Sequence, residues 1–291
     1  MADESSNEIA TTATDRPNAG EEFYNIADEQ VQIAYVQTRR AAQWVPFLLP
    51  HLRSGLRLLD CGCGVGSITL DLAERVTPGE AVGVDLDETQ LALARAGAAE
   101  RGLTNAHFQV ASAYGLPFAD ASFDVVLAHT LLIHLREPLR ALREFRRVLA
   151  PGGLVAIADD DMSTWRIAPA ASPLQRLMRE IGPQLSQATG GSPLYSPSLR
   201  GLLLEAGFAR TQGFALAAEH YGSLEETRRF ATLITRLLRN PELAQVVLAH
   251  GWTTPEQNEA DLAAVQEWGE RPDAFAAVMY CAALGWVDPA P

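Results

Sequence analysis

The chain has 291 residues, 47% of them hydrophobic and 20% charged, which is enough apolar material for a sizeable core and excludes disorder of the whole chain. Its 36 acidic and 23 basic side chains give a formal net charge of −13. This acidic balance disfavours nucleic acid and anionic membranes, because proteins hold both through Lys and Arg. No stretch approaches the ~20 apolar residues of a membrane span. We therefore expect no nucleic acid and no membrane among its partners.

The start of the chain and its cysteines bear on its compartment. The first residues, Met1-Ala-Asp-Glu, are acidic, whereas signal and transit peptides begin with basic or apolar residues, so we expect a cytoplasmic protein. The 3 cysteines cannot all pair, and Cys61 and Cys63 have no further ligands nearby in sequence. They are interpreted as reduced thiols, and no metal site is expected.

Two segments precede the regular pattern of elements. Residues 1–20 combine Ser, Thr, Asn, Asp and Pro with almost no large apolar side chain, which predicts a disordered tail. Residues 21–52 carry apolar residues at helical spacing, broken by Pro46 and Pro50, and predict a helical lid of two short helices.

Residues 53–161 alternate short apolar runs with helical segments and predict the core of the fold. The predicted strands are 56–60, 81–85, 107–111, 123–127 and 154–157. The predicted helices are 67–75, 88–101 and 139–149. This alternation is typical of a parallel sheet covered by helices on both faces, and right-handed crossovers favour the doubly wound, Rossmann-like arrangement.

The remainder is mostly helical. Residues 162–196 contain four prolines and predict cap helices, and residues 197–291 predict the end of the core sheet with a helical insertion at 223–268. Residues 208–218 and 273–287 are strand candidates, and as a returning pair they would complete a seven-stranded, mostly parallel α/β sheet.

A glycine-rich turn joins the first predicted strand to a helix. The run Leu58-Leu-Asp-Cys-Gly-Cys-Gly-Val-Gly-Ser lets backbone N–H groups approach a ligand closely. The next strand ends at Asp85, where a carboxylate can accept hydrogen bonds from ribose hydroxyls. Both NAD and adenosyl ligands offer such hydroxyls, so spacing alone leaves the two open. Ser67 stands where a dinucleotide fingerprint would have its third glycine, which disfavours NAD.

Four motifs in order resemble a known family. They are the glycine turn, the Val-Gly-Val-Asp85 strand, the stretch 115–124 (Gly-Leu-Pro-Phe-Ala-Asp-Ala-Ser-Phe-Asp) and the turn 147–153 (Arg-Val-Leu-Ala-Pro-Gly-Gly). In this register they resemble class I S-adenosylmethionine-dependent methyltransferases, in the small-molecule branch of quinone-biosynthesis and natural-product enzymes. The resemblance is close over residues 35–160 and implies that this segment is a core that binds S-adenosylmethionine.

The resemblance also implies a set of cofactor contacts at the methionine end. The backbone of Gly62, Cys63 and Gly64 would approach the methionine part of S-adenosylmethionine, beside Asp60 at the end of the first strand. Arg39 falls where related enzymes often carry an arginine that pairs with the methionine carboxylate.

Further contacts are implied at the nucleoside end. Asp85 would accept the ribose hydroxyls, with Leu86 under the adenine. Ser112 and Ala113 would cover the adenine edge, although the family usually has Asp where this chain has Ser112.

Candidates for proton transfer follow the fourth and fifth predicted strands, the rim at which doubly wound folds bind ligands. His129 and His134 follow strand four, with His129 also bordering the cofactor, and Asp159 follows strand five. The favoured hypothesis is that His134, oriented by Asp159, accepts a proton from the acceptor, with His129 as the substitute. His134 as a helix-start residue bonded to backbone is an equally open interpretation.

The segments outside the sheet are expected to cap a pocket, which favours a small-molecule substrate. Aromatic residues of these segments could line it, although such residues are more often plain core: Phe23, Tyr24, Trp165, Tyr195 and Tyr221. The sequence thus predicts methyl transfer to a small molecule, most plausibly at oxygen. The alternatives are transfer to nitrogen or carbon, non-methylating chemistry with the same cofactor, and a NAD-dependent oxidoreductase. The sequence also leaves open whether the protein forms a homodimer.

Overall fold

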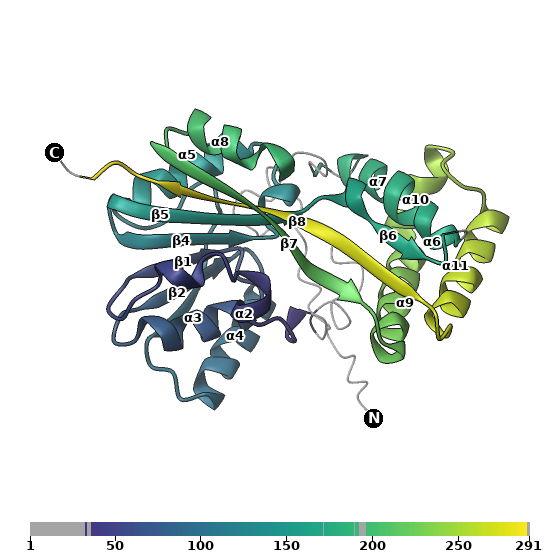
Figure 1. Ribbon diagram of the computed structural model, residues 1–291, viewed down its shortest axis with the longest axis horizontal. Helices are drawn as coiled ribbons and strands as arrows, with labels where there is room; N and C mark the ends of the chain where they lie inside the picture. The colour runs from purple at the N-terminus through teal and green to yellow at the C-terminus, as the bar shows by residue number, and fades with distance from the viewer. Residues whose placement is uncertain (1–32, 34–35, 171, 189, 192–195, 290–291) are drawn as a thin grey trace, which may run out of the picture.

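The computed structural model describes residues 33, 36–170, 172–188, 190–191 and 196–289. An eight-stranded sheet runs through it in the order β3-β2-β1-β4-β5-β8-β6, with β7 on the other edge of β8 (Figure 1). The predicted tail lies outside the described residues, as does the part of the predicted lid before residue 33.

Five parallel strands form the first part of the sheet. They are β1 (Leu58–Cys61), β2 (Ala81–Asp85), β3 (Ala106–Val110), β4 (Phe123–His129) and β5 (Leu149–Asp160). Each neighbouring pair among them is parallel, so their carboxyl ends meet at one edge. The predicted mostly parallel α/β fold is therefore confirmed.

Alternate residues of these strands face two separate helical layers. Leu58 and Leu127 pack in one cluster with α2 (Ala41–Trp44) and α3 (Ser67–Val76). Their strand neighbours Leu59 and Val126 pack in another with α5 (Pro138–Val148) and α8 (Leu199–Glu205). The remaining helix of the parallel half, α4 (Glu88–Glu100), packs on β2 and β3. Burial of both faces explains why the strands are apolar runs rather than alternating patterns.

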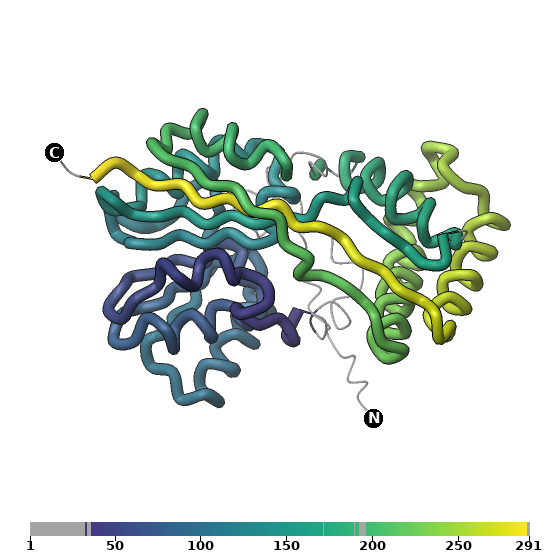
Figure 2. Tube along the Cα trace, in the orientation of Figure 1, coloured from purple at the N-terminus to yellow at the C-terminus, as the bar shows by residue number. Residues whose placement is uncertain are grey.

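Long antiparallel strands extend the sheet beyond β5. β8 (Phe275–Trp286) pairs along one edge with β5 and, farther along, with β6 (Arg166–Ala168), and along the other edge with β7 (Arg210–Tyr221). The sheet therefore has one strand more than the seven predicted, because the three residues of β6 are too few to show a period. The end of β8 that pairs with β6 lies past the carboxyl edge of β5 (Figure 2).

A helical cap surrounds this extension. Its helices are η4 (Met162–Thr164), α6 (Pro173–Arg176), η5 (Leu177–Ile181), α7 (Gly182–Ala188), α9 (Leu224–Arg239), α10 (Pro241–Ala249) and α11 (Pro255–Gly269). Each of the last three begins at a side-chain cap, with Ser223, Asn240 and Thr254 accepting from backbone N–H groups. Short 3₁₀ helices complete the chain at η2 (Leu49–His51), η3 (Leu132–His134) and η6 (Ser196–Ser198).

None of the helices in the described ranges is long and apolar enough to cross a membrane.

Candidate active site

The glycine turn follows the carboxyl end of β1. Its backbone adopts a conformation that residues other than glycine rarely adopt. Gly62, Gly64 and Gly66 all have positive φ, at 76°, 53° and 74°. A Cβ on Gly62 would lie 2.9 Å from the Leu131 side chain, and one on Gly64 would lie 2.9 Å from Gln90 Oε1. The turn is therefore a close-packed cradle whose backbone, not its side chains, faces the cavity.

Gly66 offers a test of how tightly this turn is packed. A Cβ on Gly66 would lie 2.8 Å from the Ala94 Cβ, whereas one on Gly102, which also has positive φ, would meet nothing within 4 Å. Gly102→Ala carries only the backbone cost of ~1–2 kcal/mol, while Gly66→Ala adds a packing cost of ~1–3 kcal/mol. We expect urea unfolding to show the larger loss of stability for Gly66→Ala, and equal losses would contradict close packing of the turn.

Asp85 ties this turn to the end of β2. Its carboxylate accepts the backbone N–H of Gly64 at 2.9 Å and that of Asp87 at 3.0 Å. Burial raises the pKa of Asp85 above its usual value, opposed by the bonds from these amides. Each carboxylate oxygen keeps a second acceptor position for a ligand hydroxyl.

The remaining predicted nucleoside contacts lie next to Asp85. Leu86 follows it and is half-buried, while Ser112 and Ala113 are buried in the loop that follows β3. This loop is joined to β2 because the Ala111 N–H donates to the Asp85 carbonyl at 3.1 Å. The structure thus places these four residues along one edge.

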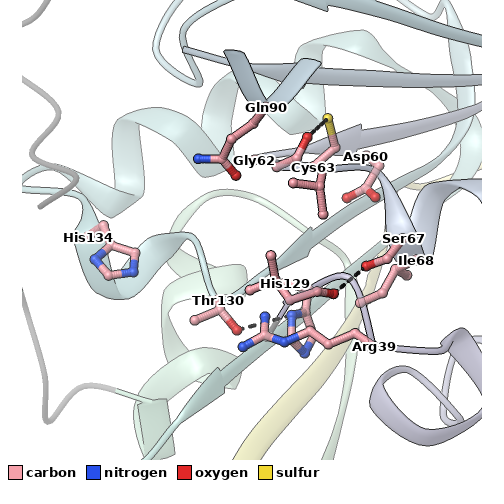
Figure 3. A pocket seen from close by; sticks show the side chains of 13 residues that line it. Arg39, Asp60, Gly62, Cys63, Ser67, Ile68, Gln90, His129, Thr130 and His134 are labelled. Carbon is pink, nitrogen blue, oxygen red and sulfur yellow. Dashed lines mark hydrogen bonds between the residues drawn. The ribbon is translucent and has the colours of Figure 1, made fainter. Parts of the chain in front are cut away.

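A pocket opens between the glycine turn and the end of β4 (Figure 3). Gly62, Cys63 and Gln90 lie on one side of it, and Arg39 and His129 lie opposite. Its lining residues are Val36, Arg39, Asp60, Gly62, Cys63, Gly64, Val65, Ser67, Ile68, Gln90, His129, Thr130 and His134.

Asp60 is a buried acid in the lining of this pocket. Thr69 donates its hydroxyl to Asp60 Oδ2 at 2.6 Å. Burial, with a smaller contribution from the charge of Asp85, raises the pKa of Asp60 to about 7, against the opposing effect of the Thr69 bond. Asp60 therefore supports the turn as a weakly acidic group near neutral pH.

His129, the last residue of β4, lines the pocket. Its Nδ1 lies 3.0 Å from the Thr130 hydroxyl, and its buried Nε2 has no partner in the described part of the chain. Trp44 contacts the ring edge-on and Tyr280 stacks on it, at centroid distances of 5.3 and 5.7 Å. Burial, reinforced by the charge of Arg39, lowers the pKa of His129 well below its usual value, so the ring is neutral.

His134 lies at the end of η3 on another side of the pocket (Figure 3). Burial and then the Arg39 charge lower its pKa to about 4. Both histidines are therefore neutral near pH 7.

Asp159 lies on the face of the sheet opposite to that of His129. It is fully buried in β5, where its neighbours Ala158 and Asp160 face the opposite side of the sheet. Ala158 is the strand partner of His129 and belongs to the cluster with α2 and α3. The orientation of His134 by Asp159 therefore stays a prediction.

Arg39 lies where the pocket meets the residues before α2. Its guanidinium carbon is 4.3 Å from the centre of the Trp44 ring. The Ser67 hydroxyl donates to the Val36 carbonyl at 2.8 Å, which fixes this segment against the start of α3. Arg39 thereby brings a positive charge to a pocket that also holds neutral histidines.

Gln90 is a lining residue that the sequence analysis missed. It lies in the first turn of α4 and is 2% exposed, and its Nε2 has no partner within the described residues. An unbonded buried amide is costly, so its position facing the pocket indicates a ligand contact. The available signal was its place one turn into the helix that follows Asp85.

Known proteins share this arrangement. A family model described as a methyltransferase domain matches residues 59–157, which include the glycine turn, Asp85 and His129. An uncharacterized methyltransferase of Schizosaccharomyces pombe is 32% identical over 208 residues, 67% of this chain and 73% of that protein. The probable methyltransferase ltbC of Aspergillus luteorubrus is 31% identical over 267 residues, 86% of this chain and 92% of that protein.

The structure of the YcgJ protein from Bacillus subtilis has the same fold, with a TM-score of 0.55 at 19% identity over 84% of this chain and 98% of that one. A doubly wound sheet with a glycine turn and a carboxylate at the next strand end defines an enzyme that binds a nucleoside cofactor. Within that class, the chain belongs to the class I S-adenosylmethionine-dependent methyltransferases. The predicted family is thereby confirmed, and the NAD-dependent alternative is set aside.

Proposed function

We propose that this methyltransferase transfers the methyl group of S-adenosylmethionine to an oxygen of a small organic molecule. The observation that carries this proposal is the unpartnered Nε2 of His129, buried in the pocket beside the glycine turn. A hydroxyl acceptor must lose a proton to become a good nucleophile, and a neutral imidazole at this place can take it.

The pocket fits the cofactor on two observations, the glycine turn whose residues 62–64 line it and the unbonded amide of Gln90. S-adenosylmethionine, when bound, supplies an electrophilic methyl group on a sulfonium. We assign the methionine part to the backbone of residues 62–64 and its carboxylate to Arg39, which can form a bidentate pair. Asp85 takes the ribose hydroxyls.

His129 would act through the tautomer in which its Nδ1–H donates to the Thr130 hydroxyl, leaving the Nε2 lone pair toward the pocket. Trp44 and Tyr280 hold the ring by edge and face, so little reorientation accompanies proton transfer. Burial of the ring also excludes water that would compete for the proton.

A set of acceptors with one carbon skeleton tests the choice of oxygen. The protein is incubated with S-adenosylmethionine labelled in its methyl group and an alcohol, an amine or a β-diketone of the same length. We expect label in the ether product. Preferential labelling of the amine or the carbon acceptor would contradict the proposal while leaving methyl transfer intact.

Gln90→Leu separates a ligand contact from a structural role. The leucine removes a buried amide that lacks a partner, so the variant is expected to be as stable as the parent or more stable. At the same time binding of S-adenosylhomocysteine is expected to weaken ~5–10-fold, because the Nε2 would lose its bond to the cofactor. Thermal unfolding and calorimetric titration measure the two effects. Lower stability with unchanged affinity would show that Gln90 is only structural.

A further inference from the structure

A second cavity adjoins the first beneath the helical cap. His134 is the residue that lines both cavities. The remainder of the second wall comes from η4, η5, α7, α9, α10 and Gly191. A molecule in this space can therefore reach the rim at which the cofactor pocket and the histidines meet.

The wall of this second cavity is aliphatic. Leucine, isoleucine and methionine side chains form most of it, and no charged residue is among its described lining. Five of these side chains are only half-buried, so they present apolar surface to the cavity: Met162, Met178, Leu185, Leu237 and Leu238. The polar side chains of its described lining are His134 and Ser186.

The cap aromatics that the structure describes pack elsewhere. Trp165 and Tyr221 both stack on Phe230, at centroid distances of 5.3 and 4.1 Å, and are buried in the core. Phe23, Tyr24 and Tyr195 lie outside the described residues. The described wall thus offers methyl and methylene surface rather than ring faces.

Such a wall favours acceptors that lose little free energy when their water is removed. An ammonium, carboxylate or phosphate placed against it would lose water without gaining a partner, which is strongly unfavourable. A neutral hydrocarbon body gains affinity for each methylene it buries. Only the end of the molecule at His134 meets a polar group that also borders the cofactor pocket.

On the basis of the methyl transfer proposed above, we propose that the acceptor is a neutral molecule with a mainly aliphatic body. That body occupies the cavity between η5, α7 and α9, and its hydroxyl end extends past His134 into the cofactor pocket, which His129 also lines. Charged amino-acid or phosphate-bearing acceptors do not fit this class.

Binding of a homologous series tests the acceptor class without a known substrate. 1-Butanol to 1-decanol are titrated calorimetrically, with and without S-adenosylhomocysteine, whose own binding is measured separately. We expect affinity to rise about fourfold per methylene until the cavity is filled. Alkanoates of equal length should bind at least tenfold more weakly than the alcohols.

Two variants locate this binding in the cavity. Leu237→Asp places a charge in the wall and should abolish the rise of affinity with chain length, while Leu204→Asp, at a leucine that is 53% exposed on α8, should not. Leu237→Phe keeps the wall apolar but fills space, so affinity should stop rising at a shorter alcohol.

The outcomes separate this inference from the proposed function. Normal binding of S-adenosylhomocysteine together with a flat alcohol series, or equal binding of alkanoates, would overturn the aliphatic class and leave methyl transfer standing. An alcohol series that both Leu237 variants leave unchanged would place the binding elsewhere and overturn the assignment. Failure of S-adenosylhomocysteine to bind would overturn the proposed function and with it the acceptor assignment.

Discussion

Replacing His129 with alanine is expected to lower kcat by ~10²–10⁴-fold, the usual contribution of a general base. Its Nε2 is buried and unpartnered in the described chain, and the residue lines the pocket beside the glycine turn. The Trp44 and Tyr280 contacts fix the ring, so loss of the imidazole removes an oriented base rather than a mobile one. Cofactor affinity should change far less than kcat, because His129 acts on the acceptor proton.

The same measurement decides between the two histidines. The sequence favoured His134, oriented by Asp159, whereas His129 has a buried ring nitrogen without a partner in the described chain. His134→Ala and the exposed His107→Ala are therefore compared with His129→Ala in kcat and in calorimetric cofactor affinity. A loss of kcat confined to His134→Ala would return the role to that residue. Full activity in all three variants would mean that alignment of the reactants suffices.

The pH dependence of kcat follows from the lowered pKa values of both histidines. Each ring must be neutral to accept a proton, so activity is present above its pKa and lost as pH falls through it. Because His134 has a pKa of about 4 and His129 one well below the usual 6.5, we expect kcat to be level from pH 6 to 8. A rise through an ionisation near 6.5 would show that the catalytic group is not buried as the structure has it.

The sequence indicated the parallel half of the fold well because each element there carries its own signal. The strand Ala81–Asp85 and the helix that begins at Glu88 follow from an apolar run, a side-chain cap at Asp87 and helical periodicity. β6 was missed because Arg166–Ala168 is paired only through the end of β8. Its existence depends on a partner more than one hundred residues away in sequence, which no local pattern shows.

Side-chain direction in β5 was the main limit on predicting the site. A strand buried on both faces has no alternation of polar and apolar residues, so its pattern does not show which of Asp159 and Asp160 faces the pocket side. The glycine turn and Asp85 were predictable because backbone form and strand ends fix their place. Gln90 and the aliphatic cavity depend on how α4 and the cap helices pack, which requires the tertiary structure.

Replacing Asp85 with alanine is expected to weaken binding of S-adenosylmethionine ~10–150-fold, because a charge-assisted bond contributes ~1.5–3 kcal/mol. The carboxylate also accepts the N–H groups of Gly64 and Asp87, so the variant loosens the turn that approaches the methionine part. Asp85→Asn keeps one acceptor oxygen and should lose less affinity than the alanine variant.

Asp124 provides the matched control for Asp85. Its carboxylate likewise accepts a backbone N–H, that of Arg57 at 2.8 Å, but it lies at the start of β4 and therefore at the opposite edge of the parallel sheet. Asp124→Ala should lower stability without changing cofactor affinity, whereas Asp85→Ala should change both. Unchanged calorimetric affinity in Asp85→Ala would remove the ribose assignment.

Burial raises the pKa of Asp85, so its carboxylate gains a proton at a higher pH than an exposed one. Cofactor binding by the parent protein should therefore weaken as the solution becomes acidic. The Asp85→Asn variant, which has no carboxylate at this position, should not show this weakening.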